Sequence, residues 1–70
     1  MTFGRRFRDE RRARGFSQHA LAQATGLTRD AISKIERGKR SPRLETLVLL
    51  SRGLGVTPGE IADWVPSKKH

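Results

Sequence analysis

Hydrogen-bonding side chains recur at helical spacing near the middle of the chain, at Arg29, Asp30, Ser33 and Lys34. On a wheel of 100° per residue, they fall on one side of a helix over about residues 28–37, opposite an alanine and two isoleucines. Arginine and lysine can donate to guanine O6 and N7, aspartate can accept from cytosine N4, and serine can do either. The chemistry that this face offers is hydrogen bonding to base edges. An ordinary solvated helix face is the alternative.

Further polar residues on either side of this face are suited to bind phosphate. Gln18 opens a preceding helix, where its side chain and the free backbone N–H groups can hold an anion, aided by the helix dipole. Beyond the face, basic side chains surround a glycine turn. If the helix lies in a DNA groove, this turn lies over the sugar-phosphate backbone, where contacts supply affinity without reading sequence. We therefore assign phosphate contacts to Gln18, Arg37, Lys39, Arg40 and Arg43.

Two short helices, over about residues 18–24 and 29–37, must position these groups. Each begins after a hydroxyl residue, Ser17 or Thr28, of the kind that caps free N–H groups, and a tight turn at Gly26 joins them. Apolar side chains on their facing sides can close one small core. Those side chains are Leu21, Leu27, Ile32 and Ile35.

Three more helices are predicted around this pair. The first spans about residues 2–14, and the fourth spans about 43–52 and ends at Gly53 and Gly55. The fifth begins at Thr57, where a hydroxyl, a proline and a glutamate form a complete start signal. The chain is therefore predicted to be all-α, a compact bundle of five helices. The fourth helix is expected to bury Leu44, Leu47, Val48 and Leu54, and the fifth presents Ile61, Trp64 and Val65 either to the core or to a dimer partner.

The size and charge of the chain limit the functional classes to which it can belong. The chain has 70 residues and a net charge of +8, and residues 1–14 and 29–43 each carry +4, as a polyanion partner requires. It has no cysteine, two scattered histidines and little volume for a pocket, so we expect no enzyme, metal or cofactor. No apolar run can span a bilayer and the start lacks the apolar core of a signal peptide, so we expect a cytoplasmic protein without a membrane partner.

The ordered set of these residues resembles the lambda-repressor/Cro-type, or XRE, helix-turn-helix family over about residues 3–65. The resemblance rests on Gly15 with Ser17-Gln18, Leu21-Ala22, Gly26, Ile32 with Ile35, Glu36-Arg37-Gly38-Lys39, Pro42, Leu44-Glu45-Thr46-Leu47, Leu54-Gly55-Val56 and Ile61. The sequence departs from the family pattern at Glu10 and Thr25, where relatives commonly carry apolar residues, and at Ala20, where they carry an acid.

The resemblance implies a lambda-repressor-like five-helix bundle with its helix-turn-helix at about residues 17–37. It also implies phosphate contact at Gln18, in the turn from Gly38 to Arg40 and at Arg43, and a structural pair between Arg11 and Glu36. Its relatives are commonly homodimers that read two half-sites, for which Ile61, Trp64 and Val65 are our dimer candidates. The base-facing positions that it implies are Thr28, Arg29, Asp30, Ser33 and Lys34.

We therefore expect residues 1–66 to form a DNA-binding domain and 67–70 a short basic tail. The expected function is a sequence-specific regulator of transcription, a repressor or dual regulator, that binds an operator with an inverted repeat. An antitoxin or a restriction-modification controller of the same fold remains open. An adaptor that binds a partner protein and a nonspecific nucleic-acid binder are rivals from other classes. Nonspecific binding to nucleic acid would leave Asp30 unexplained, because a carboxylate repels phosphate.

Overall fold

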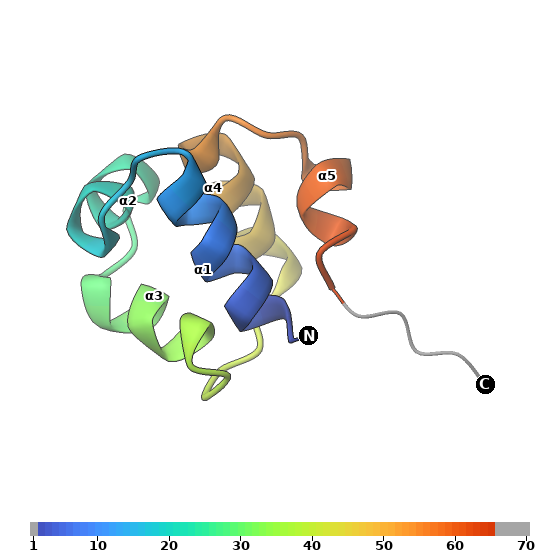
Figure 1. Ribbon diagram of the computed structural model, residues 1–70, viewed down its shortest axis with the longest axis horizontal. Helices are drawn as coiled ribbons and strands as arrows, with labels where there is room; N and C mark the ends of the chain where they lie inside the picture. The colour runs from blue at the N-terminus through green and yellow to red at the C-terminus, as the bar shows by residue number, and fades with distance from the viewer. Residues whose placement is uncertain (1, 66–70) are drawn as a thin grey trace.

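The computed structural model describes residues 2–65, and that part of the chain is built from helices and connecting turns without a strand (Figure 1). The prediction of an all-α, five-helix bundle is confirmed. The expected domain end at residue 66 and the tail over 67–70 lie outside the described residues. The helices are α1 (Phe3–Ala13), α2 (Gln18–Thr25), α3 (Arg29–Glu36), α4 (Leu44–Leu54) and α5 (Pro58–Ala62).

The helix starts follow the capping residues of the sequence. Ser17 Oγ accepts from the backbone N–H of Ala20 at 3.0 Å. Thr57 and Glu60 form a complete capping box, with distances of 2.9 and 3.0 Å. Each of these contacts satisfies an N–H group that the first helical turn leaves free. Only α4 begins without such a contact, because Arg43 at its N-cap makes no side-chain hydrogen bond.

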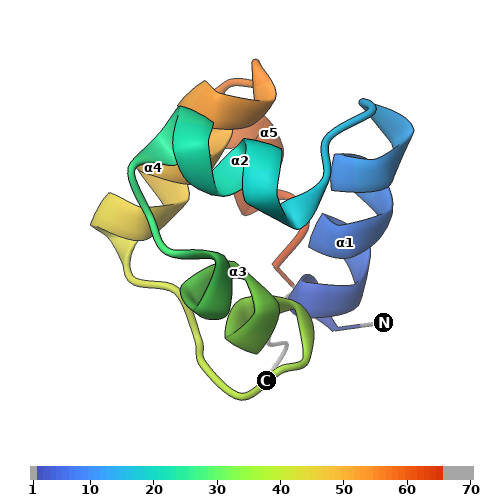
Figure 2. The same ribbon diagram turned by 90° about the vertical axis from the view of Figure 1, so that its left-hand side faces the viewer.

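The core lies where α2, α3 and α4 meet and where α1 and α5 close over them. α4 packs against both α2 and α5, while α3 packs against α2 and α1. Gly26 joins α2 to α3 with a φ of 78°, a left-handed conformation that favours glycine. In Figure 2, α3 lies below α2 and beside the start of α1, and the chain that leaves it swings outward before α4 begins. The fully buried large apolar side chains are Phe7, Leu21, Ile32, Ile35, Leu50 and Ile61.

Two expectations for α4 are wrong, one about its apolar face and one about its end. Leu44 was expected in the core but is 75% exposed, because the helix begins at this residue and its first turn lies at the surface. Gly53 was expected to end the helix but lies inside it. A β-carbon at Gly53 would overlap Thr25 Cγ2 and crowd Leu21 Cδ1, so this glycine allows α4 to approach α2 closely.

α1 is fixed to two neighbours by different kinds of contact. On one side, a side chain at Gly4 would overlap the carbonyl oxygens of Ile35 and Glu36, so α1 lies directly against the end of α3. On the other side, the guanidinium groups of Arg6 and Arg14 lie 5.7 and 5.8 Å from the centre of the Trp64 ring. The cations attract the ring electrostatically and hold the segment after α5 against α1. Within residues 2–65, no helix has the length and apolar character needed to cross a bilayer.

Candidate nucleic-acid interface

α3 presents a polar face to solvent because its apolar face is buried in the core. Ile32 and Ile35 are 0% and 1% exposed, which fixes the rotation of the helix about its own axis. Thr28 Oγ1 caps the helix by accepting from the N–H of Ala31 at 3.0 Å. The polar side predicted from the helical wheel therefore points outward. On that side, Arg29 and Asp30 are exposed, and Ser33 and Lys34 are partly exposed. Thr28, which only the family resemblance implied as base-facing, is exposed as well.

Two members of this face form an ion pair that sequence reasoning missed. Lys34 Nζ lies 3.1 Å from Asp30 Oδ2, and the side chains are 43% and 69% exposed. Their i, i+4 spacing on a helix was the signal that could have revealed the pair. An exposed pair of this kind contributes about 1 kcal/mol or less, so a base edge can replace either partner.

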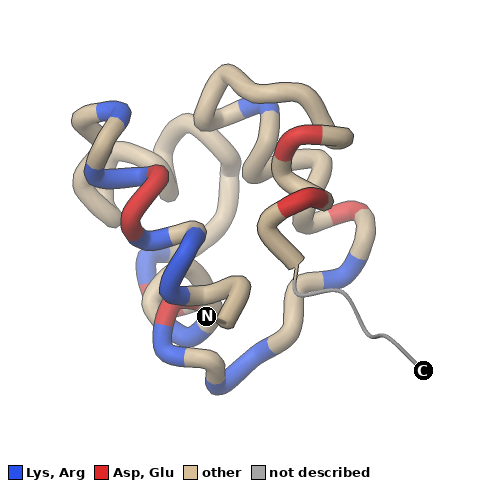
Figure 3. Tube along the Cα trace, turned by 45° about the vertical axis from the view of Figure 1, so that its right-hand side comes forward, with Lys and Arg blue, Asp and Glu red and all other residues tan. Residues whose placement is uncertain are grey.

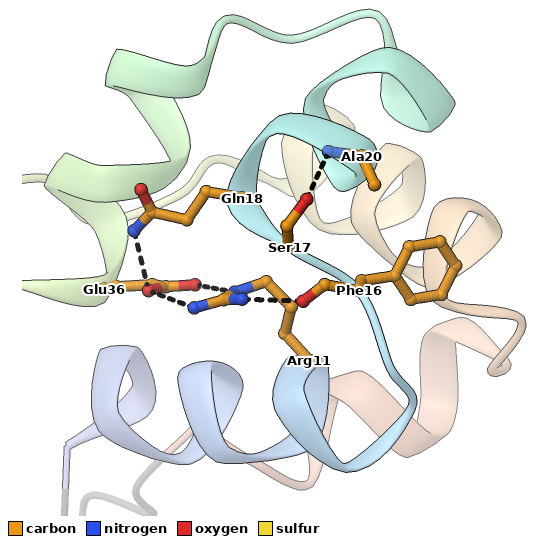
Figure 4. A network of polar contacts seen from close by, with 6 residues as sticks. All are labelled: Arg11, Phe16, Ser17, Gln18, Ala20 and Glu36. Carbon is orange, nitrogen blue, oxygen red and sulfur yellow. Dashed lines mark hydrogen bonds and ion pairs between the residues drawn. The ribbon is translucent and has the colours of Figure 1, made fainter.

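A buried polar network lies beneath the start of α2 (Figure 4). Arg11 Nε donates to Glu36 Oε2 at 2.5 Å and Nη2 donates to Oε1 at 3.1 Å, so the ion pair implied by the family resemblance is present. Arg11 Nη1 also donates to the carbonyl oxygen of Phe16 at 2.7 Å. The network ties α1, the turn before α2 and the end of α3 together.

Gln18 belongs to the same network, which sequence reasoning did not foresee. Its Nε2 donates to Glu36 Oε1 at 3.0 Å, and the residue is partly exposed at the first position of α2. One N–H of the amide is used in this bond, so the second N–H remains to donate outward. The network thus holds the Gln18 amide at the start of α2, where the first backbone N–H groups of the helix are also free.

The turn between α3 and α4 carries exposed basic side chains. Its backbone is fixed by two bonds to the end of α3, from Gly38 N to Ile35 O at 3.1 Å and from Lys39 N to Lys34 O at 2.9 Å. Between this turn and α3 lies a hollow of about 480 Å³ that reaches the first turn of α4. The side chains predicted to contact phosphate, Arg37, Lys39, Arg40 and Arg43, are all exposed, and Arg40 and Arg43 line this hollow.

Charge is divided between the two sides of the molecule (Figure 3). Basic positions follow α1 and the turn after α3 in Figure 3, whereas α5 contains Glu60 and is followed by Asp63 at its C-cap. The basic side of the molecule is thus also the side on which α3 and its flanking turn offer hydrogen-bond donors. Within the described residues, no group of three histidine, aspartate or glutamate side chains is arranged to hold a metal ion.

The three dimer candidates differ in how far they are exposed. Ile61 is 0% exposed and Trp64 is 7% exposed, because both fill the core of the single chain. Both side chains therefore pack inside the single chain, and Trp64 keeps only a small exposed surface. Val65, at 44% exposed, is the one member of the predicted set that offers apolar surface to a partner.

A family model described as helix-turn-helix matches residues 7–61. A prophage-derived, uncharacterized helix-turn-helix transcriptional regulator of Bacillus subtilis is 44% identical over 55 residues, which is 79% of this chain. The chain spans 51% of that regulator's own length.

Solved structures show the same arrangement of helices. The restriction-modification controller protein C.AhdI of Aeromonas hydrophila aligns with a TM-score of 0.80 at 39% identity, covering 84% of this chain and 89% of that one. The P22 c2 repressor, solved with a synthetic operator, aligns with a TM-score of 0.77 at 33% identity, covering 87% and 92%. With the match over residues 7–61, these likenesses show that the chain belongs to the lambda-repressor/Cro-type helix-turn-helix family.

Proposed function

We propose that this chain binds double-stranded DNA at a specific sequence and regulates transcription, with α3 in the major groove. The observation that carries the proposal is the division of α3 into two faces. Ile32 and Ile35 are buried and hold the helix in place, while its donors and acceptors stand outward. A helix held rigidly in this way can present side chains to base edges in a groove about 12 Å wide. The base-reading set is Thr28, Arg29, Asp30, Ser33 and Lys34.

The phosphate contacts lie on either side of that helix. The network around Glu36 holds Gln18 at the start of α2, and the turn after α3 carries Arg37, Lys39 and Arg40. Arg43 stands beside the uncapped first turn of α4, whose free N–H groups favour an anion. These groups would fix the position of α3 on the duplex while the base contacts select the sequence.

We further propose that the protein acts as a homodimer in the cytoplasm. Two copies would read an inverted repeat whose half-sites lie about 34–36 Å apart. Val65 is the contact candidate, because its side chain is exposed whereas Ile61 and Trp64 are used inside the core. The likeness to a repressor bound to an operator and to a restriction-modification controller supports regulation by operator occupancy. We assign the chain no catalytic step and no cofactor.

Selection of bound duplexes from a random DNA pool tests the proposal. At about 200 mM salt, nonspecific electrostatic binding is weakened, so enrichment reports base recognition. We expect an enriched inverted repeat, whose spacing gives the geometry of the dimer. A pool without a motif, with binding that vanishes as salt rises, would instead indicate a nonspecific binder. Failure to bind any duplex would favour an adaptor that binds protein through the same face.

A further inference from the structure

The six arginines of the N-terminal segment, residues 1–14, fall into two groups. Three are engaged within the fold, since Arg6 and Arg14 bind Glu10 while Arg11 binds Glu36. The other three make no ion pair with any described residue. Their spacing of three and four residues places them along one face of α1. These unpaired residues are Arg5, Arg8 and Arg12.

Arg8 differs from the two others because its side chain is held by the fold. Arg5 and Arg12 are exposed, whereas Arg8 is partly buried. Its Nε is enclosed by protein atoms yet has no hydrogen-bond partner among the described residues. A guanidinium has five N–H donors and no acceptor. A ligand outside the fold cannot reach the enclosed Nε, so it would be bound by the other donors of the group.

The place of Arg8 in the fold indicates which ligand could reach those donors. Gly4, one turn earlier on α1, lies directly against the carbonyl oxygens of Ile35 and Glu36 at the end of α3. Side chains on a helix lean toward its N-terminus, so Arg8 covers the surface beside this contact between α1 and α3. It therefore stands on the side of α1 that borders the end of α3 and the start of its flanking turn.

The acidic side chains around this position are engaged or turned away. Glu36 already accepts from Arg11 and from Gln18. Glu10 accepts from Arg6 and Arg14 on the opposite side of α1. The next residue, Asp9, is exposed and lies a further 100° around the helix from Arg8. Among the described residues, the fold thus supplies no anion to Arg8, although it restricts the side chain.

We propose that Arg8 binds a phosphate of the DNA backbone. The inference rests on the proposed DNA-binding function and adds a contact from α1 to those of α2, α3 and the turn after α3. A guanidinium matches the planar pair of oxygens that a phosphate offers, and burial of Nε restricts the side chain before DNA arrives. Arg8 therefore contributes affinity without selecting a base.

Titration of binding against salt tests this role in the full chain. For Arg8→Gln, we expect weaker binding to both the selected duplex and an unrelated one. The slope of log affinity against log salt should become shallower by about 0.9, so the loss is about threefold to fourfold larger at 50 mM than at 200 mM salt. The matched control is Arg52→Gln, which removes the same charge from an exposed arginine near the end of α4 that makes no ion pair within residues 2–65.

A scan with single neutral methylphosphonate linkages identifies the partner of Arg8. We expect one linkage outside the bases contacted by α3 to weaken wild-type binding but to have no further effect on Arg8→Gln. The variant should melt at the wild-type temperature or above, because Nε has no partner in the fold whose loss could destabilise it.

The outcomes separate the two proposals. If the wild type selects a motif but Arg8→Gln matches Arg52→Gln in affinity and slope, Arg8 is only a solvated surface arginine and this inference is overturned. If no linkage shows coupling to Arg8, the inference is likewise wrong. If the wild type itself selects no motif, the proposed function fails.

Discussion

Arg11 on α1 and Glu36 on α3 form a bidentate ion pair whose side chains are only 6% and 2% exposed. The pair joins the N-terminal helix to the end of the proposed recognition helix. Because Gln18 donates to the same carboxylate, one buried anion also positions the start of α2. The arrangement of the proposed interface therefore depends on a buried ion pair between α1 and α3.

Removal of one partner of this pair should be costly. Glu36→Ala leaves the Arg11 guanidinium buried without its anion, and we expect the free energy of unfolding to fall by about 3–5 kcal/mol. Replacement of both partners, as Arg11→Met with Glu36→Leu, should recover much of that loss because no buried charge remains. Urea unfolding followed by circular dichroism measures both, with the exposed Glu45→Gln as control. A single-variant loss below about 1 kcal/mol would contradict the role assigned to the pair.

Because α1 lies so close to α3, we expect alanine at Gly4 to destabilise the fold, the opposite of its usual effect in a helix. In an open helical position, Gly→Ala usually stabilises by about 1 kcal/mol. At Gly4 the added methyl group would overlap two backbone carbonyl oxygens, so we expect Gly4→Ala to destabilise by about 1–3 kcal/mol. Gly59→Ala is the matched control, since its nearest neighbouring atom beyond the chain neighbours is 3.8 Å away. Thermal melting of both variants measures the two effects. If both substitutions shift the melting temperature in the same direction, the close contact is refuted.

Glu10 predicts a dependence of stability on pH. Hydrogen bonds from Arg14 and then from Arg6 lower the pKa of this carboxyl below its ordinary value of 4.5. A lowered pKa in the folded state means that the carboxylate stabilises the fold above about pH 4.5 and loses this effect as the pH falls through the folded value. The difference in melting temperature between wild type and Glu10→Gln should therefore be largest near neutral pH and shrink in acid. Asp9→Asn is the control, and a difference that grows in acid would contradict the assignment.

Arg43 should contribute affinity without sequence preference. Its side chain makes no capping contact in α4, so Arg43→Ala should leave the melting temperature unchanged. We expect weaker binding to every duplex and a salt slope that is shallower by about one unit. Fluorescence anisotropy at several salt concentrations, with Arg52→Ala as control, measures both quantities. An unchanged slope would remove Arg43 from the phosphate contacts.

Local signals in the sequence were sufficient to predict the helices. The caps at Ser17, Thr28 and Thr57 and the turn at Gly26 all act within a few residues, so they can be read without knowledge of the fold. The outward face of α3 was predicted for the same reason, since helical periodicity separates it from Ile32 and Ile35. The register of an amphipathic helix is a local property.

Contacts between distant segments could not be predicted from the residues alone. Thr25 departs from the apolar pattern because Gly53 brings α4 against it, and its hydroxyl donates to the Leu21 carbonyl at 2.8 Å. Leu44 was misplaced because helical periodicity does not tell which turn of α4 extends beyond the core. The pairing of Gln18 with Glu36 and the enclosure of Arg8 likewise depend on how the helices meet.

The most direct test of the account removes single major-groove atoms from the DNA. A 7-deaza purine lacks N7, the acceptor that adenine and guanine both present in the major groove. Each purine of a selected half-site would be replaced in turn, and affinity measured for wild type, Arg29→Ala and Lys34→Ala. We predict that one replacement costs the wild type about 1–3 kcal/mol but costs one of these variants almost nothing, because its contact is already lost. Wild-type binding that tolerates every replacement, or variants that lose affinity equally on selected and random DNA, would contradict base reading by α3.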